Sequence, residues 1–464
     1  MWTPRSLDDG KPFYLALADA LQDDVARGRL RPGTRLPPQR SLAKRLGVDF
    51  TTISRAYAEA GRRGLVAAHV GRGTFVRRIE TDPGIAPRFG PDGSVDLSLN
   101  LPPEAVIEAG GAALATTLDE IRGDAGLATL LRYQQNAGRD DHRAVAAAWV
   151  AERYGAPVAP ERIVLCGGAQ HAITALLSTL TGDGDAVATE VLTYQGFKAI
   201  ADLFHRPIIG LPIDDGGIDV RGFEKACRTQ GVRAVYCTPT LHNPTGSVMN
   251  MTRRRAIARI ARDYGVALIE DDVYGPLMAD APASLSSFAP ELGFYIASVS
   301  KVVSPGLRLA FVVTPSERDA ARIAATVRAT AWMATPLTAE IATHWIRAGT
   351  AERIIGLARG EVARRQKVAR AILRKAELPV RGDPRALHLW LELPAPWTAA
   401  DFVRAAQRAG VLVMPAEAFA VSTYAGPPAV RLSLTGAPSL EALTTALGRV
   451  ASLARSVPGH PIAL

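Results

Sequence analysis

A lysine stands directly after a short apolar run in the segment Ser298-Val299-Ser300-Lys301, and Arg308 follows a few residues later. An amine that is to form an imine needs a lowered pKa, and a phosphate ester beside it needs fixed donors such as serine hydroxyls and an arginine. The segment therefore predicts a Schiff-base lysine. Because Ser-x-x-Lys is also the nucleophile motif of penicillin-binding proteins, this fragment alone leaves both chemistries open. The Lys-Thr-Gly segment that accompanies the second chemistry is absent from the sequence.

Three further fragments carry groups that could surround such a lysine. Residues 167–170, Gly-Gly-Ala-Gln, lie between a predicted strand and a predicted helix, where backbone N–H groups and the helix dipole can hold a phosphate. Asn243 follows another predicted strand, and Asp271 and Tyr274 lie at the end of a third. Singly, each fragment would more often be a turn or a cap. Together they place an amide, a carboxylate and a phenol at one edge of a sheet.

Short apolar runs alternate with helical stretches through this part of the chain. The runs are residues 162–165, 186–188, 234–236, 266–269, 294–297 and 309–313. Because they are apolar on both faces and separated by helices, they predict a mainly parallel α/β sheet with ligand chemistry at the strand ends. A smaller α+β part is predicted from about residue 339 to the C-terminus, with strands at 387–391 and 429–433.

The first 80 residues have a different character. They hold 15 Lys and Arg against 8 Asp and Glu, a net charge of +7, while the whole chain of 464 residues has a net charge of +9. A basic surface of this kind suits binding to a phosphate backbone, although a solvated basic face would have the same composition. Apolar periodicity predicts helices at 13–25, 39–46 and 50–62, followed by a short hairpin that ends at residue 76.

Residues 81–93 combine three prolines and three glycines without apolar periodicity, which predicts a short linker. The expected domains are therefore 1–80, the linker 81–93, and 94–464. No apolar run approaches the ~18 residues that span a bilayer, and the N-terminus does not read as a signal peptide, so we expect a cytoplasmic protein without a membrane partner. Cys166, Cys227 and Cys237 lack metal-ligand spacing, so we expect reduced thiols and no metal site.

The N-terminal segment resembles a GntR-type winged helix-turn-helix. The resemblance rests on the segments 33–43, 46–48, 56–57 and 71–76, of which the last is Gly-Arg-Gly-Thr-Phe-Val. It implies that the third helix lies in the major groove of an operator and that the hairpin reaches the minor groove. The DNA contacts that it implies are Arg35, Thr51, Thr52, Arg55 and Arg72. One position departs from the family: many members have an arginine where this chain has Phe50.

The later fragments together resemble the fold-type-I, class I/II aminotransferases, which bind pyridoxal 5′-phosphate, over roughly residues 95–455. The resemblance implies that Lys301 binds the cofactor as an aldimine, that Asp271 pairs with the pyridine nitrogen, and that Tyr194 stacks on the ring. It implies two hydrogen bonds to the ring's 3-oxygen, from Asn243 and Tyr274. The phosphate contacts that it implies are Ala169, Gln170, Ser298, Ser300, Arg308 and, from the other subunit of a homodimer, Tyr133. Arg431 matches the arginine that binds the α-carboxylate of a substrate or effector.

The order of the two parts resembles the MocR subfamily of bacterial regulators, and this likeness covers essentially the whole chain. It implies a DNA-binding transcriptional regulator that responds to pyridoxal phosphate, to an amino-acid-like effector, or to both. It also implies a homodimer on a double-stranded operator. Because the linker is short, we expect each DNA reader to stay close to the large domain or to its dimer partner. Two alternatives stay open: an aminotransferase that turns over and carries an appended DNA-binding domain, and a sensor of pyridoxal phosphate itself.

Overall fold

The computed structural model describes residues 2–4, 10–26, 29–30, 34–62, 65–69, 73–76, 94–124, 127–421 and 426–456. The chain divides into two compact units, Met1–Ala86 and Pro87–Leu464. Arg72 and the predicted linker 81–93 lie outside the described residues, so the domain limits inferred from the sequence stay a prediction.

The N-terminal unit consists of three helices and a hairpin: α1 (Phe13–Ala26), α2 (Gln39–Leu46), α3 (Phe50–Arg62), β1 (Val66–His69) and β2 (Gly73–Val76). The two strands pair antiparallel. Asp49 begins α3, because its side-chain Oδ1 accepts a hydrogen bond of 2.8 Å from the backbone N–H of Thr51. The buried face of α3, with Ile53, Tyr57 and Ala60, packs against α1 and α2.

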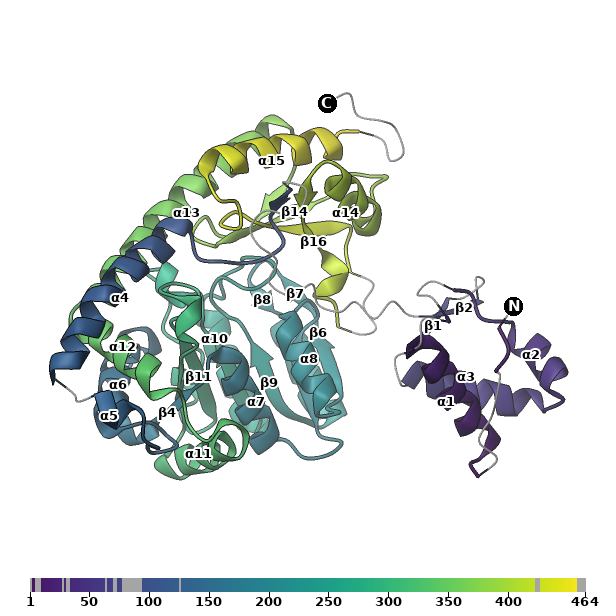
Figure 1. Ribbon diagram of the computed structural model, residues 1–464, viewed down its shortest axis with the longest axis horizontal. Helices are drawn as coiled ribbons and strands as arrows, with labels where there is room; N and C mark the ends of the chain where they lie inside the picture. Colours follow the sequence, from purple (N-terminus) through teal and green to yellow (C-terminus); the bar gives the residue numbers. More distant parts are fainter. Residues whose placement is uncertain are drawn as a thin grey trace. The chain divides into compact units, whose positions relative to one another are not determined.

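The larger unit is built on a seven-stranded sheet (Figure 1). Its strand order is β4 (Ile163–Cys166), β12 (Ala310–Val313), β11 (Gly293–Ser298), β10 (Ala267–Asp271), β9 (Val232–Cys237), β5 (Ala186–Glu190) and β6 (Ile208–Leu211). Within this sheet β12 pairs antiparallel with both neighbours and the other pairings are parallel. The expected mainly parallel sheet is confirmed. The sequence analysis missed the edge strand β6, which is short and only partly buried.

Helices cover both faces of this sheet, because alternate side chains of each buried strand point to opposite sides. On one face, Val164, Ile269 and Ile296 pack against α7 (Ala169–Leu180), α8 (Gln195–Leu203) and α11 (Glu317–Ala331). On the other face lie α6 (Asp140–Tyr154), α9 (Val220–Gln230), α10 (Met251–Tyr264) and α12 (Pro336–Arg347). The helices α4 (Glu104–Asp124) and α13 (Thr350–Lys375) run side by side at the left of Figure 1.

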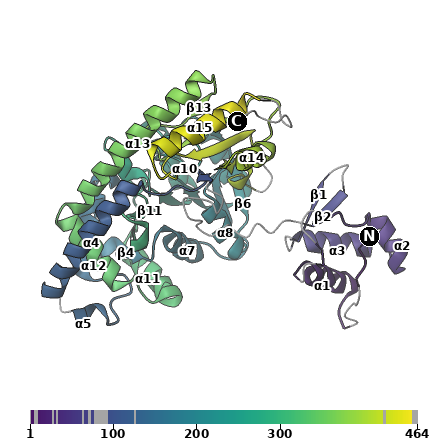
Figure 2. The ribbon, with the colours of Figure 1, turned by 45° about the horizontal axis from the view of Figure 1, so that its top comes forward.

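A smaller sheet forms a second layer toward the C-terminus (Figure 2), with the strand order β13 (Val380–Arg381), β14 (His388–Glu392), β17 (Ala429–Ser433) and β16 (Met414–Pro415). It packs under α14 (Ala399–Arg408) and α15 (Leu440–Ala454). The early strand β3 (Val95–Asp96) pairs with β15 (Val411–Leu412), so residues from the start of the unit join this late part.

The predicted start of the smaller part at about residue 339 is wrong. Ile341, Ala342 and Trp345 of α12 pack into the core of the large sheet, whereas Ala369 and Leu373 near the end of α13 pack with the smaller sheet. Along α13, the packing therefore changes from the core of the large sheet to that of the smaller sheet. A long helix that keeps one apolar stripe along its whole length gives no sequence signal for such a change.

The remaining elements are short: α5 (Leu127–Leu130), β7 (Ile213–Asp214), β8 (Gly217–Ile218) and the 3-10 helices η1 (Pro160–Arg162), η2 (Gly275–Leu277), η3 (Ser286–Phe288), η4 (Pro305–Leu307) and η5 (Ala416–Ala418). Across the described ranges, no helix combines the length and the apolar character that crossing a membrane requires.

Candidate functional site

Lys301 lies just beyond the end of β11, beside the end of β10, where the parallel strands present their carboxyl ends. Its Nζ donates a hydrogen bond of 2.8 Å to the backbone oxygen of Asn100. Burial lowers the pKa of this amine to about 8, and the positive charges of Arg431 and Arg308 act in the same direction, while Asp271 opposes them. At neutral to mildly alkaline pH, part of the population is therefore a neutral, nucleophilic amine.

Asp271, the last residue of β10, faces this amine, and only one of its two carboxylate oxygens is hydrogen-bonded within the described residues. Its Oδ2 accepts a hydrogen bond of 2.7 Å from the Tyr236 hydroxyl. Its Oδ1 is buried and has no hydrogen-bond partner among the described residues. Burial raises the pKa of the carboxyl to about 6, although the bond from Tyr236 lowers it. A buried carboxylate oxygen without a partner is costly, and it can accept a hydrogen bond from a bound cationic or N–H group.

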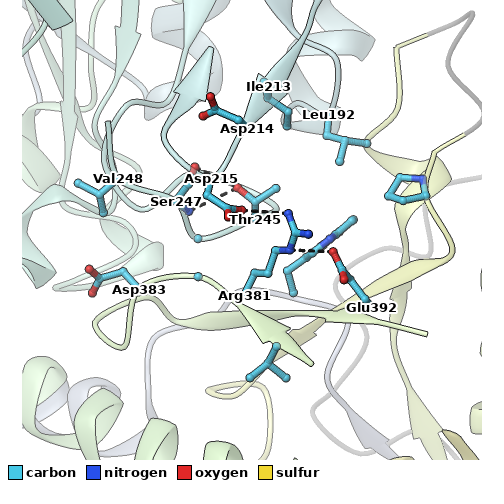
Figure 3. Close-up of a pocket in the computed structure, with 15 residues that line it drawn as sticks. Leu192, Ile213, Asp214, Asp215, Thr245, Ser247, Val248, Arg381, Asp383 and Glu392 are labelled. Carbon is cyan, nitrogen blue, oxygen red and sulfur yellow. Dashed lines mark hydrogen bonds and ion pairs between the residues drawn. The ribbon is translucent and has the colours of Figure 1, made fainter. Parts of the chain in front are cut away.

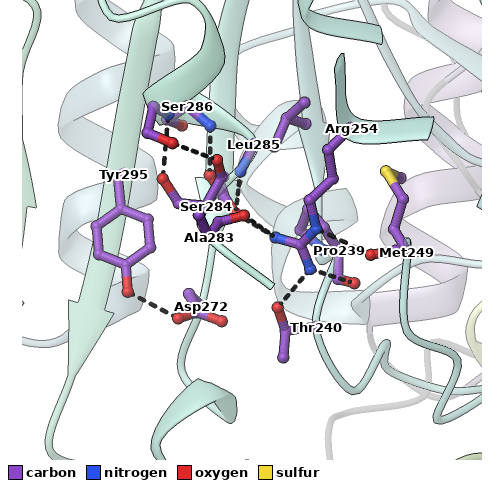
Figure 4. A network of polar contacts seen from close by, with 12 residues as sticks. Pro239, Thr240, Met249, Arg254, Asp272, Ala283, Ser284, Leu285, Ser286 and Tyr295 are labelled. Carbon is purple, nitrogen blue, oxygen red and sulfur yellow. Dashed lines mark hydrogen bonds and ion pairs between the residues drawn. The ribbon is translucent and has the colours of Figure 1, made fainter. Parts of the chain in front are cut away.

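The two carboxylates beside Asp271 point the other way, because side chains alternate along a strand. Arg254, which is fully buried, lies 3.4 Å from Glu270, and the backbone N–H groups of Leu285 and Ser286 donate to the same carboxylate at 3.0 and 2.7 Å. Asp272 accepts hydrogen bonds from Arg153 at 2.8 Å and Tyr295 at 2.7 Å. Figure 4 shows this network at the edge of the sheet. The arginines thus neutralise the flanking acids and leave Asp271 as the acid on the Lys301 side.

Arg431 of β17 brings the smaller sheet into the same site. Its guanidinium donates to Asn243 Oδ1 at 2.7 Å and to the backbone oxygen of Ser98, and it lies over the ring of Phe419 at 4.9 Å from the ring centroid. Its buried Nε has no partner within the described part of the chain. Burial lowers the pKa of the guanidinium to about 10. Because Asn243 uses its oxygen on Arg431, its amide N–H groups are left to donate elsewhere.

Asn100 and His388 complete the site, and the sequence analysis missed both. The Asn100 side-chain amide donates to the Tyr274 hydroxyl at 3.1 Å and lies 2.9 Å from His388 Nδ1, while His388 Nε2 lies 3.1 Å from the backbone oxygen of His242. That arrangement fixes a neutral His388 whose Nε2 carries the proton, and burial lowers its pKa to about 3. Since Tyr274 accepts from Asn100, it retains its own hydroxyl proton as a donor.

The N-terminus of α7 forms a cradle suited to an anion. Gly168 caps the helix with a φ of 90°, and no side chain caps it. A Cβ built on Gly168 would lie 2.9 Å from an Arg308 guanidinium nitrogen, so glycine is needed for this arginine to approach the helix end. Ala169 and Gln170 supply the first N–H groups of the helix, where the dipole favours a negative charge.

The two serines of the cradle are held by each other and by backbone. Ser298 is fully buried and donates to the backbone oxygen of Leu309 at 3.0 Å, and its Oγ lies 3.1 Å from that of Ser300. Tyr194 caps α8 next to Gly196, where a Cβ would collide with the tyrosine ring. Burial raises the pKa of the Tyr194 hydroxyl to about 12, so it stays a hydrogen-bond donor at neutral pH.

Tyr133, Gln170 and Arg308 of the predicted cofactor set are exposed. The Tyr133 side chain is 80% exposed and its ring packs on Trp332, with the ring centroids 5.2 Å apart. A residue that serves the other subunit of a dimer has to be exposed in this way.

A cavity of about 690 Å³ opens beside the site between the loops of the two sheets (Figure 3). Thr245 and Ser247, close to Asn243, line one side, and Trp390 lies on another. Arg381 lies in the cavity and forms ion pairs with Asp215 at 2.9 Å and Glu392 at 2.7 Å. These pairs connect the two layers and leave room for a small molecule.

Within the N-terminal unit, the predicted DNA-contacting residues that are described lie at or near the surface. Arg35 and Thr51 are exposed, Thr52 is partly exposed, and Arg55 is exposed with its guanidinium 4.2 Å from the centroid of the Tyr14 ring. Phe50 is 44% exposed at the first turn of α3. Thr51, Thr52 and Arg55 thus form a polar and basic face on α3.

The site residues fit pyridoxal phosphate. They provide a half-buried amine with a lowered pKa, a buried carboxylate oxygen that awaits a donor, and an uncapped helix N-terminus beside an arginine. Residues 95–450 match the family model described as aminotransferase class I and II, and residues 13–76 match that of the bacterial regulatory proteins of the gntR family. The chain belongs to the class I and II aminotransferase family and carries a GntR-family DNA-binding domain.

Related transcriptional regulators align with most of this chain. The uncharacterised HTH-type transcriptional regulator YdeF of Bacillus subtilis is 32% identical over 96% of this chain and 95% of its own length. The vitamin B6 salvage pathway transcriptional repressor PtsJ of Salmonella typhimurium is 29% identical over 89% of this chain and 92% of its own length. The chain is therefore a transcriptional regulator of the MocR type, as the resemblance implied.

Solved structures confirm the fold of the larger unit. An archaeal alanine:glyoxylate aminotransferase superposes with a TM-score of 0.72 at 23% identity, covering 78% of this chain and 90% of its own. The α-aminoadipate aminotransferase LysN of Thermus thermophilus, solved with N-(5′-phosphopyridoxyl)-L-leucine, gives 0.70 at 22% identity, covering 78% and 92%. Proteins of this fold use pyridoxal 5′-phosphate, which confirms the cofactor expected from the sequence.

The lowered pKa of Lys301 predicts how cofactor uptake depends on pH. The neutral amine is the reactive form, and its fraction rises about tenfold per pH unit below the pKa of about 8 and levels off above it. We expect the rate constant for uptake of pyridoxal phosphate by the cofactor-free protein to follow this curve between pH 6 and 10, as measured by visible absorbance. A midpoint near 10.5, the ordinary lysine value, would contradict the burial argument.

Proposed function

We propose that DNA binding by this regulator responds to pyridoxal phosphate held on Lys301 and to an amino-acid-like effector held on Arg431. The observation that carries the proposal is the convergence of Lys301, Asp271 and Arg431 on one site in a chain that also has a DNA reader. When bound, pyridoxal phosphate supplies an aldehyde carbon for an amine and a ring that withdraws electrons.

The residues of the site divide this work among them. Asp271 Oδ1 would accept a hydrogen bond from the protonated pyridine nitrogen. Asn243 and Tyr274 would each donate a remaining hydrogen bond to the ring's 3-oxygen. Tyr194 would stack on the ring. The N–H groups at the start of α7 would hold the phosphate, and the further contacts proposed for it are Ser298, Ser300 and Arg308. For Asp271, Asn243 and Tyr274, this division follows from which donors and acceptors the network leaves over.

Arg431 is suited to bind the α-carboxylate of the effector. Its guanidinium is buried between two layers of the unit, and its Nε is unused within the described residues. A carboxylate could accept bidentate hydrogen bonds there while the effector's amine approaches Lys301. The effector class is therefore an amino acid rather than a simple amine, and the neighbouring cavity of about 690 Å³ accommodates its side chain.

The exposed apolar residues near Tyr133 support the proposal of a homodimer. Several large apolar side chains are exposed there, at 45% to 88% for Leu127, Leu131, Tyr133 and Trp332. Patches of this kind mark association surfaces, and Tyr133 would then serve the partner's phosphate. A double-stranded operator, read by two N-terminal units, is the DNA partner, and the protein acts in the cytoplasm.

Arg431→Ala tests the assignment of the effector site. Loss of a charge-assisted, bidentate contact should weaken binding of the effector amino acid by roughly ten- to hundredfold. The affinity for pyridoxal phosphate should change much less. The measurement is a titration of the cofactor-loaded protein with a panel of amino acids and amines, followed by visible absorbance and by the affinity for operator DNA.

Arg364→Ala is a matched control, because Arg364 is an exposed arginine on α13. Equal losses of effector and cofactor would contradict the role of Arg431. An operator affinity that is indifferent to every pyridoxal ligand would contradict the proposed response.

Aminotransferase turnover is the second candidate, because the same three groups are those that transamination needs. Sustained conversion of a keto acid to an amino acid, lost in Lys301→Ala, would establish turnover. A band that shifts once on addition of the amino acid and then persists would favour the sensor.

A further inference from the structure

An exposed aromatic side chain stands at the N-terminal end of the DNA-reading helix. Phe50 is the first residue of α3 and is 44% exposed. It is not part of the apolar core of the described N-terminal unit, which α3 reaches through Ile53, Ala56 and Tyr57 instead. A ring in this position contributes little to folding, and its exposure at the first turn of α3 leaves it accessible to a ligand.

The surroundings of Phe50 are basic and hollow. The guanidinium carbon of Arg40 lies over its ring, 6.0 Å from the ring centroid. A cavity of about 320 Å³ is lined by Phe50 together with Arg35, Arg40 and Thr74, among others. The cavity therefore lies between the start of α2, the start of α3 and the first residues of β2. Two arginines at its rim suit phosphate oxygens, and the ring beside them suits an apolar group.

The cation–π contact restrains the ring. An arginine over an aromatic face at an exposed site contributes about 0.5–1 kcal/mol, enough to favour one orientation of the ring over others. Arg40 covers a face of the ring, so other parts of the ring remain available to a ligand. Phe50 is therefore presented with a preferred ring orientation beside Thr51, which belongs to the predicted DNA contacts.

The chemistry of the major groove leaves one good partner for such a ring. Base edges there carry hydrogen-bond donors and acceptors, except for the C5-methyl group of thymine. Packing a phenyl ring against a polar edge would remove water from groups that the ring cannot pair with. We infer that Phe50 is a specificity-determining residue that contacts the methyl group of a thymine in the operator.

This inference rests on the proposed placement of α3 in the major groove, and the experiment separates the two. The full-length, cofactor-loaded protein is used to enrich binding sites from a random duplex library. Each thymine of the enriched duplex is then replaced by deoxyuridine, which removes the methyl group alone. At one thymine the affinity of the wild type should fall about fourfold, the factor that corresponds to ~0.8 kcal/mol for one buried methyl-sized group.

Variants at residue 50 complete the test. Phe50→Ala should bind the thymine and deoxyuridine duplexes equally well, and Phe50→Arg should enrich guanine at that position, because arginine pairs with O6 and N7 of guanine. Tyr264→Ala, which removes an exposed aromatic ring from α10 of the larger unit, should keep the wild-type preference. Thermal unfolding of each variant verifies that the N-terminal unit is folded.

Two outcomes would overturn the inference while leaving the DNA reader intact. One is an enriched duplex in which every thymine tolerates deoxyuridine. The other is a Phe50→Ala variant that loses affinity for all duplexes alike, which would indicate contact with the sugar-phosphate backbone. A wild type that enriches no duplex would instead overturn the proposed reading of DNA through α3, and the role of Phe50 with it.

Discussion

Replacing Asp271 with Asn is expected to stabilise the cofactor-free protein at neutral pH while it weakens binding of pyridoxal phosphate. Burial raises the pKa of Asp271 to about 6 from an ordinary value of 3.8. The folded protein therefore holds this proton more tightly than the unfolded chain. Ionisation of Asp271 does not affect the free energy of unfolding below about pH 4. It lowers this free energy as the pH rises from 4 to 6, and above pH 6 the total decrease is about 3 kcal/mol.

The amide of Asp271→Asn cannot ionise, so the variant avoids this loss. Its free energy of unfolding should equal that of the wild type near pH 4 and exceed it by up to about 3 kcal/mol at pH 7. Urea unfolding of the cofactor-free protein from pH 4 to 8, followed by tryptophan fluorescence, measures this difference. Five of the six tryptophans, residues 149, 332, 345, 390 and 397, lie in the larger unit, so the signal reports on the unit that contains Asp271.

Binding of pyridoxal phosphate should reverse this difference, so that the wild type becomes more stable than Asp271→Asn. Asp271 would pair with the protonated pyridine nitrogen, and removal of one partner from a buried charge pair costs about 3–5 kcal/mol, which corresponds to more than a hundredfold in affinity. Asp263→Asn, at an exposed position of α10, serves as the control and should change neither quantity. A variant that is less stable than the wild type without cofactor would show that the carboxylate is already well paired in the free protein.

The chemical groups of the site could be predicted from sequence because each belongs to a local fragment at the end of a strand. Lys301, Asp271 and Asn243 follow three strands of one sheet, and parallel strands present their carboxyl ends at one edge. The pattern of apolar runs was enough to place that edge. The limits of α2 and α3 were predicted for a similar reason, since Gly47 and Asp49 are local stop and start signals.

The groups that hold the site together could not be predicted in this way. Asn100 contacts Tyr274 and His388, which are 174 and 288 residues away in the chain. Neither Asn100 nor His388 lies in a fragment with its own chemical signature. Their roles arise because β3 crosses to pair with β15 and carries the following residues into the site. Contacts of this range depend on tertiary packing, which no short window of sequence contains.

Replacing Arg254 with Met is expected to destabilise the larger unit by about 3–5 kcal/mol, because it leaves Glu270 as an uncompensated buried acid. The guanidinium is fully buried and donates to the backbone oxygens of Met249, Ala283 and Pro239 at 2.9, 3.2 and 3.1 Å and to Thr240 Oγ1 at 2.8 Å. All of these bonds would be lost together. Urea unfolding at pH 7 measures the effect.

The pH dependence of the Arg254→Met variant distinguishes a charge effect from a packing effect. Burial already raises the pKa of Glu270, and the nearby Arg254 lowers it, so loss of the arginine raises it further. A carboxyl with a raised pKa in the folded state costs stability as the pH rises, so the variant's deficit should grow from pH 5 to pH 7. In the double variant Arg254→Met, Glu270→Gln, much of this increase of the stability deficit with pH should disappear. A deficit that is constant with pH, and equal in the single and double variants, would mean that the arginine acts through its packing and backbone contacts rather than through its charge.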